Sequence, residues 1–360
     1  MKKLLSMSLA LAMVLTLFVG CGKSGPAASS NNAPAASASS AATSTPAPAE
    51  DAMPTLENPA TIDAVEFVGG PSNGGWAMIS AAIADKANPY FEGFPITATT
   101  GGAVANPAVM VAGDAQIGLT QSLFLNKLLA GEEPYEAPSD DLRAIASLES
   151  TAMYFIVDAS CPYNTLGELI DAGYKTKVGA MVASAASSIV GEMILQEYGL
   201  SGIADLQDSG EVYVADGSAL YDAYGDRHFD LLIVNKSTSD ASLKELLGKR
   251  DSKILGIDEK VINSMHDKYG WGSIAIPGGT YAGNDADVTS ISIKSILVVH
   301  KDVPDALAYV LAKVVCEEKP YLETVQASYK AFGVEDMVQN TVVDMHPGAL
   351  KYWQEAGLIK

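Results

Sequence analysis

The sequence predicts an α/β protein of two lobes, each built on a mostly parallel sheet with flanking helices, with a ligand cleft between the lobes. From residue 62 onward, short β-rich runs alternate with helical patterns, which is typical of such sheets. Two further β-rich runs, 153–157 and 291–299, are placed to carry the chain into a second lobe and back. We expect these crossings to act as the hinge when the lobes close on a ligand.

The first predicted lobe comprises residues 61–155 and 292–360. Trp76, Ile79 and Ile83 follow one another at helical spacing, which predicts a helix that buries this face. The other elements are read from β-rich runs and apolar periodicity. In chain order they are strands at 64–68, 96–99, 116–120 and 142–148, and helices through 109–112, at 123–129 and from about 304 to 317.

The second predicted lobe comprises residues 156–291. The run 153–157 enters it and the long run 291–299 leaves it. Between them the pattern predicts helices at 165–171 and 187–198, and strands at 177–181, 211–214 and 229–234. No helix or strand is assigned to the segment from 238 to 290.

The N-terminus predicts export and a lipid anchor. Residues 1–20 have basic Lys2 and Lys3 followed by an apolar run that is too short to span a membrane, as in a signal peptide. Gly20 and Cys21 end a lipobox-like stretch, in which the Cys21 thiol accepts diacylglycerol. The alternative is a chance cysteine beside an ordinary cleavage site. Residues 21–60 then form a linker rich in Ala, Ser and Pro, whose composition predicts disorder. The globular part is therefore expected to be extracytoplasmic and lipid-anchored to the bacterial cell membrane.

Composition excludes several classes of partner and cofactor. The formal net charge of −20 leaves no basic face for nucleic acid or anionic lipid. The four histidines are scattered, so we expect no metal and no cofactor. Cys161 and Cys316 have no metal-ligand spacing; they have packing or loop roles, or they pair as a disulfide in an oxidising compartment.

Small polar residues and glycines follow the ends of five predicted strands. In open parallel sheets, ligands bind at these ends, where helix N-termini point, and exposed N–H groups there suit an anion. Ordinary N-capping is the alternative, because Ser, Thr, Asn and Gly are common caps. The five groups are Ser72 to Gly75, Thr100 to Gly102, Gln121 with Ser122, Ser184 with Ser187 and Ser188, and Asn235 with Ser237 and Thr238.

Five segments, in family order from Val68 to Leu358, resemble the TAXI-type solute receptors of TRAP (tripartite ATP-independent periplasmic) transporters. The resemblance departs from the family at Pro71 to Asn73, at Trp76 and in the loop 182–187, which are expected ligand positions. The matching segments are the Gly-rich loop Val68 to Gly75, Thr100 to Asn106, Ala112 to Gly118, Pro277 to Gly283, and the tail from His346 through Tyr352 to Leu358.

The resemblance implies a type II periplasmic-binding-protein-like fold and a receptor rather than an enzyme. Such a receptor closes on a glutamate-like amino acid or a small carboxylic acid and delivers it to a TRAP permease driven by an ion gradient. We expect a monomer that binds no nucleic acid. The candidate ligand-binding residues are Ser72, Asn73, Gly74, Gly75, Trp76, Thr100, Gly101, Gly102, Asn106, Gln121, Ser122, Ser184, Ser187, Ser188, Asn235 and Tyr281.

Other interpretations remain open at the level of sequence. The same fold serves ABC importers and sensor modules. Residues 70–74 also fit a G-x-S-x-G elbow, with Ser72 as nucleophile and Asp344 and His346 as partners, although Ser72 follows the first strand and the partners are nearly adjacent. Residues 284–287 resemble part of a calcium loop, for which a solvated acidic turn is the alternative. Trp76 and Tyr154 are read either as core residues or as ligand-stacking residues.

The lipobox hypothesis predicts that Cys21→Ala releases the protein from the membrane or leaves an unprocessed precursor. Each buried methylene of an acyl chain contributes about 0.8 kcal/mol to membrane binding, so two or three chains hold the protein firmly. Detergent partitioning of the variant and the wild type measures this. Identical partitioning of the two proteins would contradict a lipid on Cys21.

Overall fold

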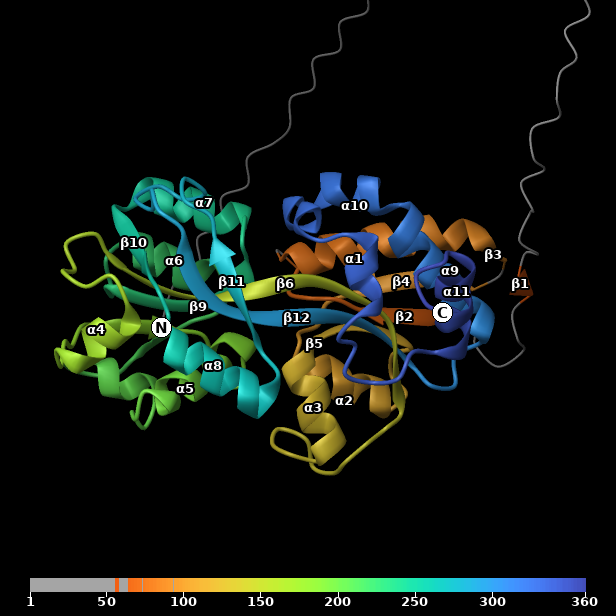
Figure 1. Cartoon of the computed structure of the whole chain (residues 1–360), viewed down its shortest axis with the longest axis horizontal. Helices are drawn as coiled ribbons and strands as arrows, with labels where there is room; N and C mark the ends of the chain where they lie inside the picture. The colour runs from red at the N-terminus through yellow and green to blue at the C-terminus, as the bar shows by residue number, and fades with distance from the viewer. Residues whose placement is uncertain (1–55, 58–63, 73, 93) are drawn as a thin grey trace, which may run out of the picture. The chain divides into compact units, whose positions relative to one another are not determined.

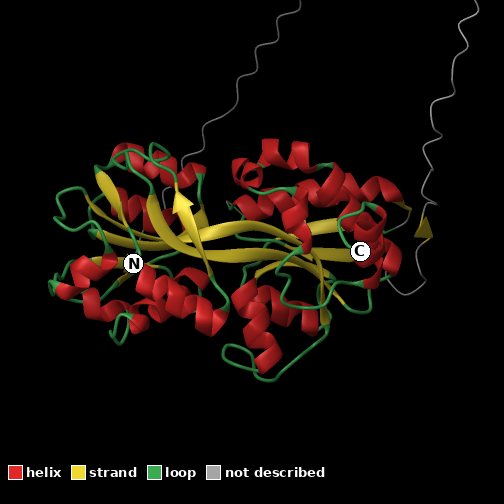
Figure 2. Ribbon diagram, viewed as in Figure 1, coloured by secondary structure: helices red, strands yellow, loops and turns green. Residues whose placement is uncertain are grey.

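The structure is a computed structural model that describes residues 56–57, 64–72, 74–92 and 94–360. The predicted signal peptide, Cys21 and nearly all of the linker lie outside these residues. The described chain is built on a ten-stranded mixed sheet with the order β4-β2-β5-β12-β6-β9-β7-β8, in which β10 pairs with β6 and β11 with β12. Helices cover both faces of this sheet (Figure 2).

Lobe 1 is the part of the sheet in which β4, β2 and β5 run parallel, and β12 pairs antiparallel with β5. One face is covered by α1, α9 and α11, whose buried side chains form an apolar core with the strands. Its strands are β2 (Val65–Val68), β4 (Ile96–Thr99) and β5 (Ile117–Gln121), with β1 (Leu56–Glu57) and β3 (Phe91–Glu92) as a separate pair. Its helices are α1 (Gly75–Ala87), α2 (Ala105–Val111), α3 (Ser122–Ala130), α9 (Asp305–Glu317), α10 (Lys319–Val325) and α11 (Pro347–Glu355), with 3-10 turns η1 (Asn88–Tyr90), η3 (Ala327–Ala331) and η4 (Val334–Val338).

Lobe 2 is the part in which β9, β7 and β8 run parallel, and β6 pairs antiparallel with β9. Its strands are β7 (Val178–Ala180), β8 (Tyr213–Val214), β9 (Leu231–Ser237), β10 (Ser252–Leu255) and β11 (Gly272–Ile276). Its helices are α4 (Leu166–Asp171), α5 (Ala186–Glu197), α6 (Gly217–Gly225), α7 (Ala241–Lys249) and α8 (Glu259–Tyr269), with the 3-10 turn η2 (Ile203–Leu206).

Two long strands connect the lobes. β6 (Leu142–Asp158) has 17 residues and β12 (Val288–His300) has 13. They pair antiparallel from Leu142 opposite His300 to Ala152 opposite Ser292. In Figure 1 both strands run between the two groups of helices. The expected hinge segments 153–157 and 291–299 therefore lie inside continuous, paired strands.

The sequence prediction of two strands at 142–148 and 153–157 is wrong, because β6 is a single strand. The polar residues Glu149, Ser150 and Thr151, which lie between the two predicted strands, all belong to β6. An irregularity in the pairing, between Lys294 and Ile296 of β12, accommodates the extra residue that β6 carries there.

Other expectations also need correction. The strand predicted at 211–214 is only the two-residue β8, and the unassigned segment 238–290 contains α7, β10, α8 and β11. Cys161 and Cys316 are free thiols, so the disulfide alternative is not realised: Cys161 is buried and Cys316 is half-buried in α9. The apolar surroundings of both residues fit the packing role.

The C-terminal helix is fastened to lobe 1 by a buried contact. The Trp353 indole N–H donates to the Ile145 carbonyl of β6 at 2.8 Å, and Trp353 is fully buried. At the start of the same helix, a Cβ placed on Gly348 would lie 1.8 Å from the Asp305 carbonyl oxygen at the start of α9. Close approach of two backbones thus requires glycine at this position.

We therefore predict that Gly348→Ala destabilises the protein by about 1–3 kcal/mol or more, because the new methyl group must displace backbone. Gly102→Ala is the matched control, since a Cβ there has no heavy atom within 4 Å. Its effect on unfolding should stay within about 0.5 kcal/mol. Chemical denaturation of both variants measures the difference. Equal midpoints for the two would contradict the packing described for Gly348.

Candidate functional site

Two loops of lobe 1 lie together at the carboxyl ends of β2 and β4. The Gly101 N–H donates to the Gly70 carbonyl at 3.1 Å, and the Gly69 N–H donates to the Thr99 carbonyl at 3.0 Å. Ser72 and Thr100 are exposed on these loops, while Gly74, Gly75, Gly101 and Gly102 are half-buried. Asn73 lies outside the described residues. The structure thus brings together the first two groups of predicted site residues.

Asn106 holds these loops from beneath. Its Oδ1 accepts from the Gly102 N–H at 2.8 Å, and its Nδ2 faces the carbonyls of Val68, Gly69 and Leu119 at 3.1, 2.8 and 2.7 Å. The side chain is only 1% exposed. The sequence analysis gave Asn106 as a ligand contact, whereas the structure engages its whole amide in joining β2, β5 and the loop before α2. Asn106 thus positions the loops.

The helices that begin at the predicted site have no side-chain caps. The N-caps of α1, α2, α3 and α5 are Gly74, Val104, Gln121 and Ala185, and none of these described side chains bonds to its helix. Thr165, Asp240 and His346 cap α4, α7 and α11 with their side chains, whereas α6, α8, α9 and α10, away from the site, also have no side-chain cap. The hydroxyl groups near the site therefore do not serve as N-caps, which leaves N–H groups and the positive ends of helix dipoles for a ligand.

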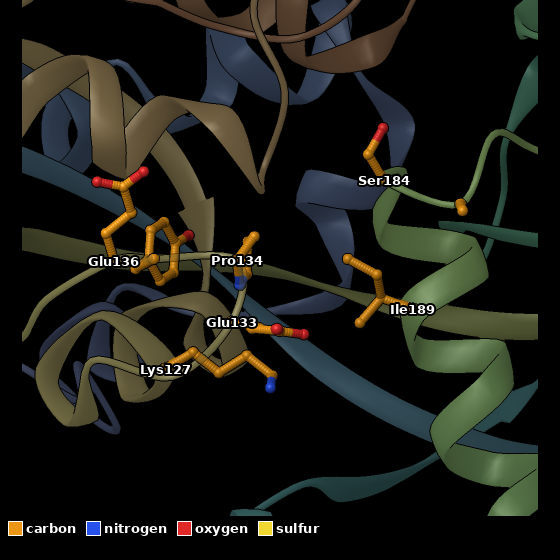
Figure 3. A pocket seen from close by; sticks show the side chains of 8 residues that line it. Lys127, Glu133, Pro134, Glu136, Ser184 and Ile189 are labelled. Atoms are coloured by element: carbon orange, nitrogen blue, oxygen red, sulfur yellow. The ribbon is translucent and has the colours of Figure 1, made fainter.

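A cleft of about 860 Å³ lies between the lobes beside α5. In Figure 3, Ser184 and Ile189 of lobe 2 face Lys127, Glu133 and Glu136 of lobe 1 across it. The remaining lining residues are Pro134, Tyr135 and Ala183. Ser184 is exposed there, and it is the one candidate ligand residue among the residues that line this cleft.

The first turn of α5 contains the other two predicted serines. Ser188 Oγ donates to the Met181 carbonyl at 2.8 Å, which fastens the helix to the loop after β7. Ser187 is 5% exposed, and its Oγ has no hydrogen-bond partner within the described part of the chain. Buried hydroxyl groups are normally paired, so Ser187 is a group that a ligand or a water can satisfy.

The cleft wall carries both signs of charge. The Lys127 ammonium is 3.6 Å from the Glu132 carboxylate, and Glu133 and Glu136 are exposed nearby. Tyr135 donates its hydroxyl to the Val104 carbonyl at 2.9 Å, and burial raises its pKa well above the ordinary value. The tyrosine is thus a neutral structural member of this wall.

Side chains from both lobes meet where β5 and β9 end. Gln121 Nε2 donates to Asn235 Oδ1 at 2.7 Å and to Thr151 Oγ1 at 3.1 Å, and Asn235 Nδ2 donates to the Ala152 carbonyl at 3.2 Å. Gln121 Oε1 is buried and unpaired within the described residues. Ser122, the first residue of α3, is half-buried beside it. The predicted residues Gln121 and Asn235 are therefore direct neighbours across the lobe boundary.

Sequence reasoning missed Glu149, which is 1% exposed in the middle of β6. Its Oε1 accepts from Gln326 Nε2 at 2.7 Å, and its Oε2 accepts from Ser237 Oγ at 2.8 Å and also from Ser328 Oγ. Loss of hydration on burial raises the pKa of the Glu149 carboxyl, although the hydroxyl and amide donors oppose this rise. A lone carboxyl inside an apolar strand was the sequence signal that could have marked it.

Trp76, Tyr154 and Tyr281 have mainly packing roles. Trp76 is half-buried against the cores on both faces of the sheet. Tyr281 is 3% exposed, its OH accepts from the Asp240 N–H at 3.1 Å, and burial raises its pKa to about 12. Its OH is 3.3 Å from that of Tyr154, which donates to the Ser237 carbonyl at 3.0 Å. The structure thus places Tyr281 in the lobe 2 core, behind Ser237, rather than on the cleft wall.

The hydrolase and calcium interpretations find no support in the geometry. His346 is 1% exposed, and its Nδ1 accepts from the Gly348 N–H at 3.2 Å as the cap of α11, whereas Ser72 is on an exposed loop. Asn284 is buried and accepts from the Ile254 N–H, and Asp287 accepts from the Gly278 N–H. Among residues 64–72, 74–92 and 94–360, no three acidic, His or Cys side chains form a metal cluster, and no helix is long and apolar enough to cross a membrane.

Comparison with known proteins places the chain in a family. The model of the NMT1-like family matches residues 68–357, so the chain belongs to this family. PhnD1 from Prochlorococcus marinus MIT 9301, solved with methylphosphonate, is 10% identical with a TM-score of 0.50, over 82% of this chain and 99% of that one. The periplasmic binding protein BugD is 15% identical with a TM-score of 0.48, over 82% and 98%. The predicted α/β, two-lobed periplasmic-binding-protein-like fold is thereby confirmed.

The role of Asn106 generates a prediction. Asn106→Ala leaves the carbonyls of Val68, Gly69 and Leu119 without their buried donor, which costs about 1–3 kcal/mol for an unsatisfied group. We expect a clear fall in the denaturation midpoint. Asn263→Ala, at an exposed position of α8, is the control and should change stability by about 0.5 kcal/mol at most. Equal stability of the two variants would show that the Asn106 amide does not hold the loops.

Proposed function

We propose that this chain is an extracytoplasmic receptor that captures a small carboxylate or an amino acid and delivers it to a TRAP-type permease. The observation that carries this proposal is the set of uncapped helices at the strand ends of both lobes, α1 and α3 in lobe 1 and α5 in lobe 2. Their N–H groups and the nearby hydroxyls are suited to hold an anion. Family membership and the two-lobed fold support a small-molecule receptor.

The engagement of the arginines supports binding by N–H groups and hydroxyls. Carboxylate receptors often use an arginine fork, but Arg250 is 2% exposed and pairs with Asp158 at 3.3 Å and Asp230 at 2.7 Å. Arg227 also pairs with Asp158. Arg143 donates to the backbone carbonyls of Asp140 and Leu142. These are the only arginines of the sequence. Each one therefore has a structural partner outside the predicted ligand loops.

The mixed charge of the cleft wall favours an amino acid over a simple dicarboxylate. Lys127 offers one ammonium group, while Glu133 and Glu136 offer two carboxylates. A ligand with both an amino and a carboxyl group is complementary to such a wall, whereas a second carboxylate would be repelled by Glu133 and Glu136.

The transporter partner is proposed from the sequence resemblance. The segments Pro277 to Gly283 and His346 to Leu358 match TAXI-type receptors, and the predicted lipid on Cys21 would keep such a receptor beside a membrane permease. A gene for a large multi-span permease next to this one would support the assignment. A neighbouring ATPase gene would favour an ABC importer instead.

Thermal-shift screening of the purified full-length protein against amino acids, monocarboxylates, dicarboxylates and sugars tests the ligand class. We predict that Thr100→Val weakens the best hit by tenfold or more, about 1.4 kcal/mol, because a hydroxyl donor to the ligand is lost. The control Arg143→Gln should bind nearly as the wild type does. Calorimetry measures both. A decisive arginine with a neutral Thr100, or a screen in which only sugars or cations bind, would contradict the proposal.

A further inference from the structure

We propose that Glu149 is a positioning residue that clasps the two lobes together, and that this clasp loosens as pH rises. This inference rests on the proposed function in one respect, that closure of the lobes is what retains a ligand. Glu149 lies in β6 where the strand passes from lobe 1 to lobe 2, two residues before Thr151, which pairs with Ser237 of β9.

The clasp joins three segments that are distant in sequence. The Glu149 carboxyl accepts from Ser237 at the end of β9 in lobe 2, and from Gln326 and Ser328, which follow α10 in lobe 1. Gln326 Nε2 also reaches Ser237 Oγ at 3.2 Å and Ser328 Oγ at 3.0 Å. One carboxyl group is therefore the common acceptor for donors from both lobes.

Both ends of the clasp are fixed to parts that face the predicted ligand. On the lobe 2 side, the Ser237 carbonyl accepts from the Tyr154 hydroxyl at 3.0 Å, two residues from Asn235. On the lobe 1 side, a Cβ on Gly75 would lie 2.3 Å from Gln326 Oε1, so Gln326 packs against the start of α1. A change at Glu149 is thus passed directly to the loop that carries Ser72 to Trp76.

No cation neutralises this carboxyl group among the described residues. None of the ion pairs includes Glu149, and those of the neighbouring lysines Lys86, Lys236 and Lys319 go to other carboxylates. Lys236 of β9 lies 3.7 Å from Asp240, and Lys319 of α10 bonds Glu323 and the Tyr329 carbonyl. On β12, Lys294 has Asp336 as its nearby charge. Tyr329 of η3 also faces Glu149, and burial together with this carboxyl keeps its pKa far above the ordinary value.

The sign of the pH effect follows from desolvation. In the closed form, burial without a counter-ion raises the pKa of Glu149 above its ordinary value of 4.5. Separation of the lobes admits water, and this regained hydration, the larger effect, outweighs the loss of the Ser237 hydrogen bond and returns the pKa of Glu149 toward that value. Closure therefore takes up a proton. Protonation of Glu149 favours the closed form fully below the ordinary pKa, and this advantage is lost as pH rises through the raised pKa of the closed form. For one titrating group, the equilibrium constant for closure falls by at most tenfold per pH unit.

Hydrogen–deuterium exchange on the full-length protein without ligand tests the clasp. Amides at 235–240 and 326–331 are compared at pH 5.5 and pH 8.0, after correction for intrinsic rates. We expect protection of both segments in the wild type to fall several-fold at pH 8.0. Glu149→Gln should remove this pH dependence, because its amide carries no charge at either pH. The control Glu92→Gln, at an exposed position, should behave as the wild type does. Equal pH dependence in wild type and Glu149→Gln would overturn the proposal.

Ser237→Ala provides a second test that does not alter the carboxyl group. It removes one donor from lobe 2 and should lower protection of both segments already at pH 5.5. Retention of wild-type protection at pH 5.5 would contradict a clasp through Ser237. Neither exchange experiment contains a ligand, so both test the clasp even if no carboxylate binds.

Where the screen does yield a ligand, its Kd should rise between pH 5.5 and 8.0 in the wild type but stay nearly constant in Glu149→Gln. A parallel rise in both proteins would also overturn the clasp.

Discussion

The antiparallel pairing of β6 with β12 is the constraint on which the rest of the structure depends. These strands are long enough to belong to both lobes, and their lobe 2 ends also pair with β10 and β11. β5 pairs with β12, whereas β9 pairs with β6. β5 and β9 run in opposite directions toward the middle of the β6–β12 pair. Their carboxyl ends therefore lie close together at the boundary between the lobes. The contact between Gln121 and Asn235 is the direct result.

This meeting of strand ends forces polar groups into a buried place. Backbone and side-chain groups there lose water when the cores of both lobes come together, and each needs a partner. Gln121 Nε2 donates to Thr151 and Asn235, and the Glu149 carboxyl accepts from Ser237, Gln326 and Ser328, while Gln121 Oε1 has no partner among the described residues. Such networks are fully effective only when the lobes are in register, so they make closure specific as well as favourable. The clasp and the ligand loops are therefore two outcomes of one topology.

The sequence predicted the alternation of strands and helices and the groups at the strand ends, because these depend on local periodicity and turn chemistry. It failed where tertiary contacts decide. The two predicted strands exclude residues 149–152, since local patterns do not show that distant segments satisfy the polar side chains there inside a sheet. Asn106 read as a ligand contact, although backbone carbonyls of distant strands consume its amide. The helices α7 and α8 were not predicted, and their apolar faces pack into the two cores of lobe 2. The signal peptide, the lipid on Cys21 and the domain boundaries remain predictions.

An acidic chain that captures an anion must do so with short-range forces. A formal charge of −20 repels a carboxylate at long range, but at physiological ionic strength this field is screened over about 8 Å. Helix N–H groups act within hydrogen-bond distance, where salt has little influence. The uncapped starts of α1, α3 and α5 supply such groups in addition to the ammonium group of Lys127 on the cleft wall. Because these groups are fixed by backbone geometry, the loops that Asn106 and Ser188 hold in place determine where the ligand's charge must lie.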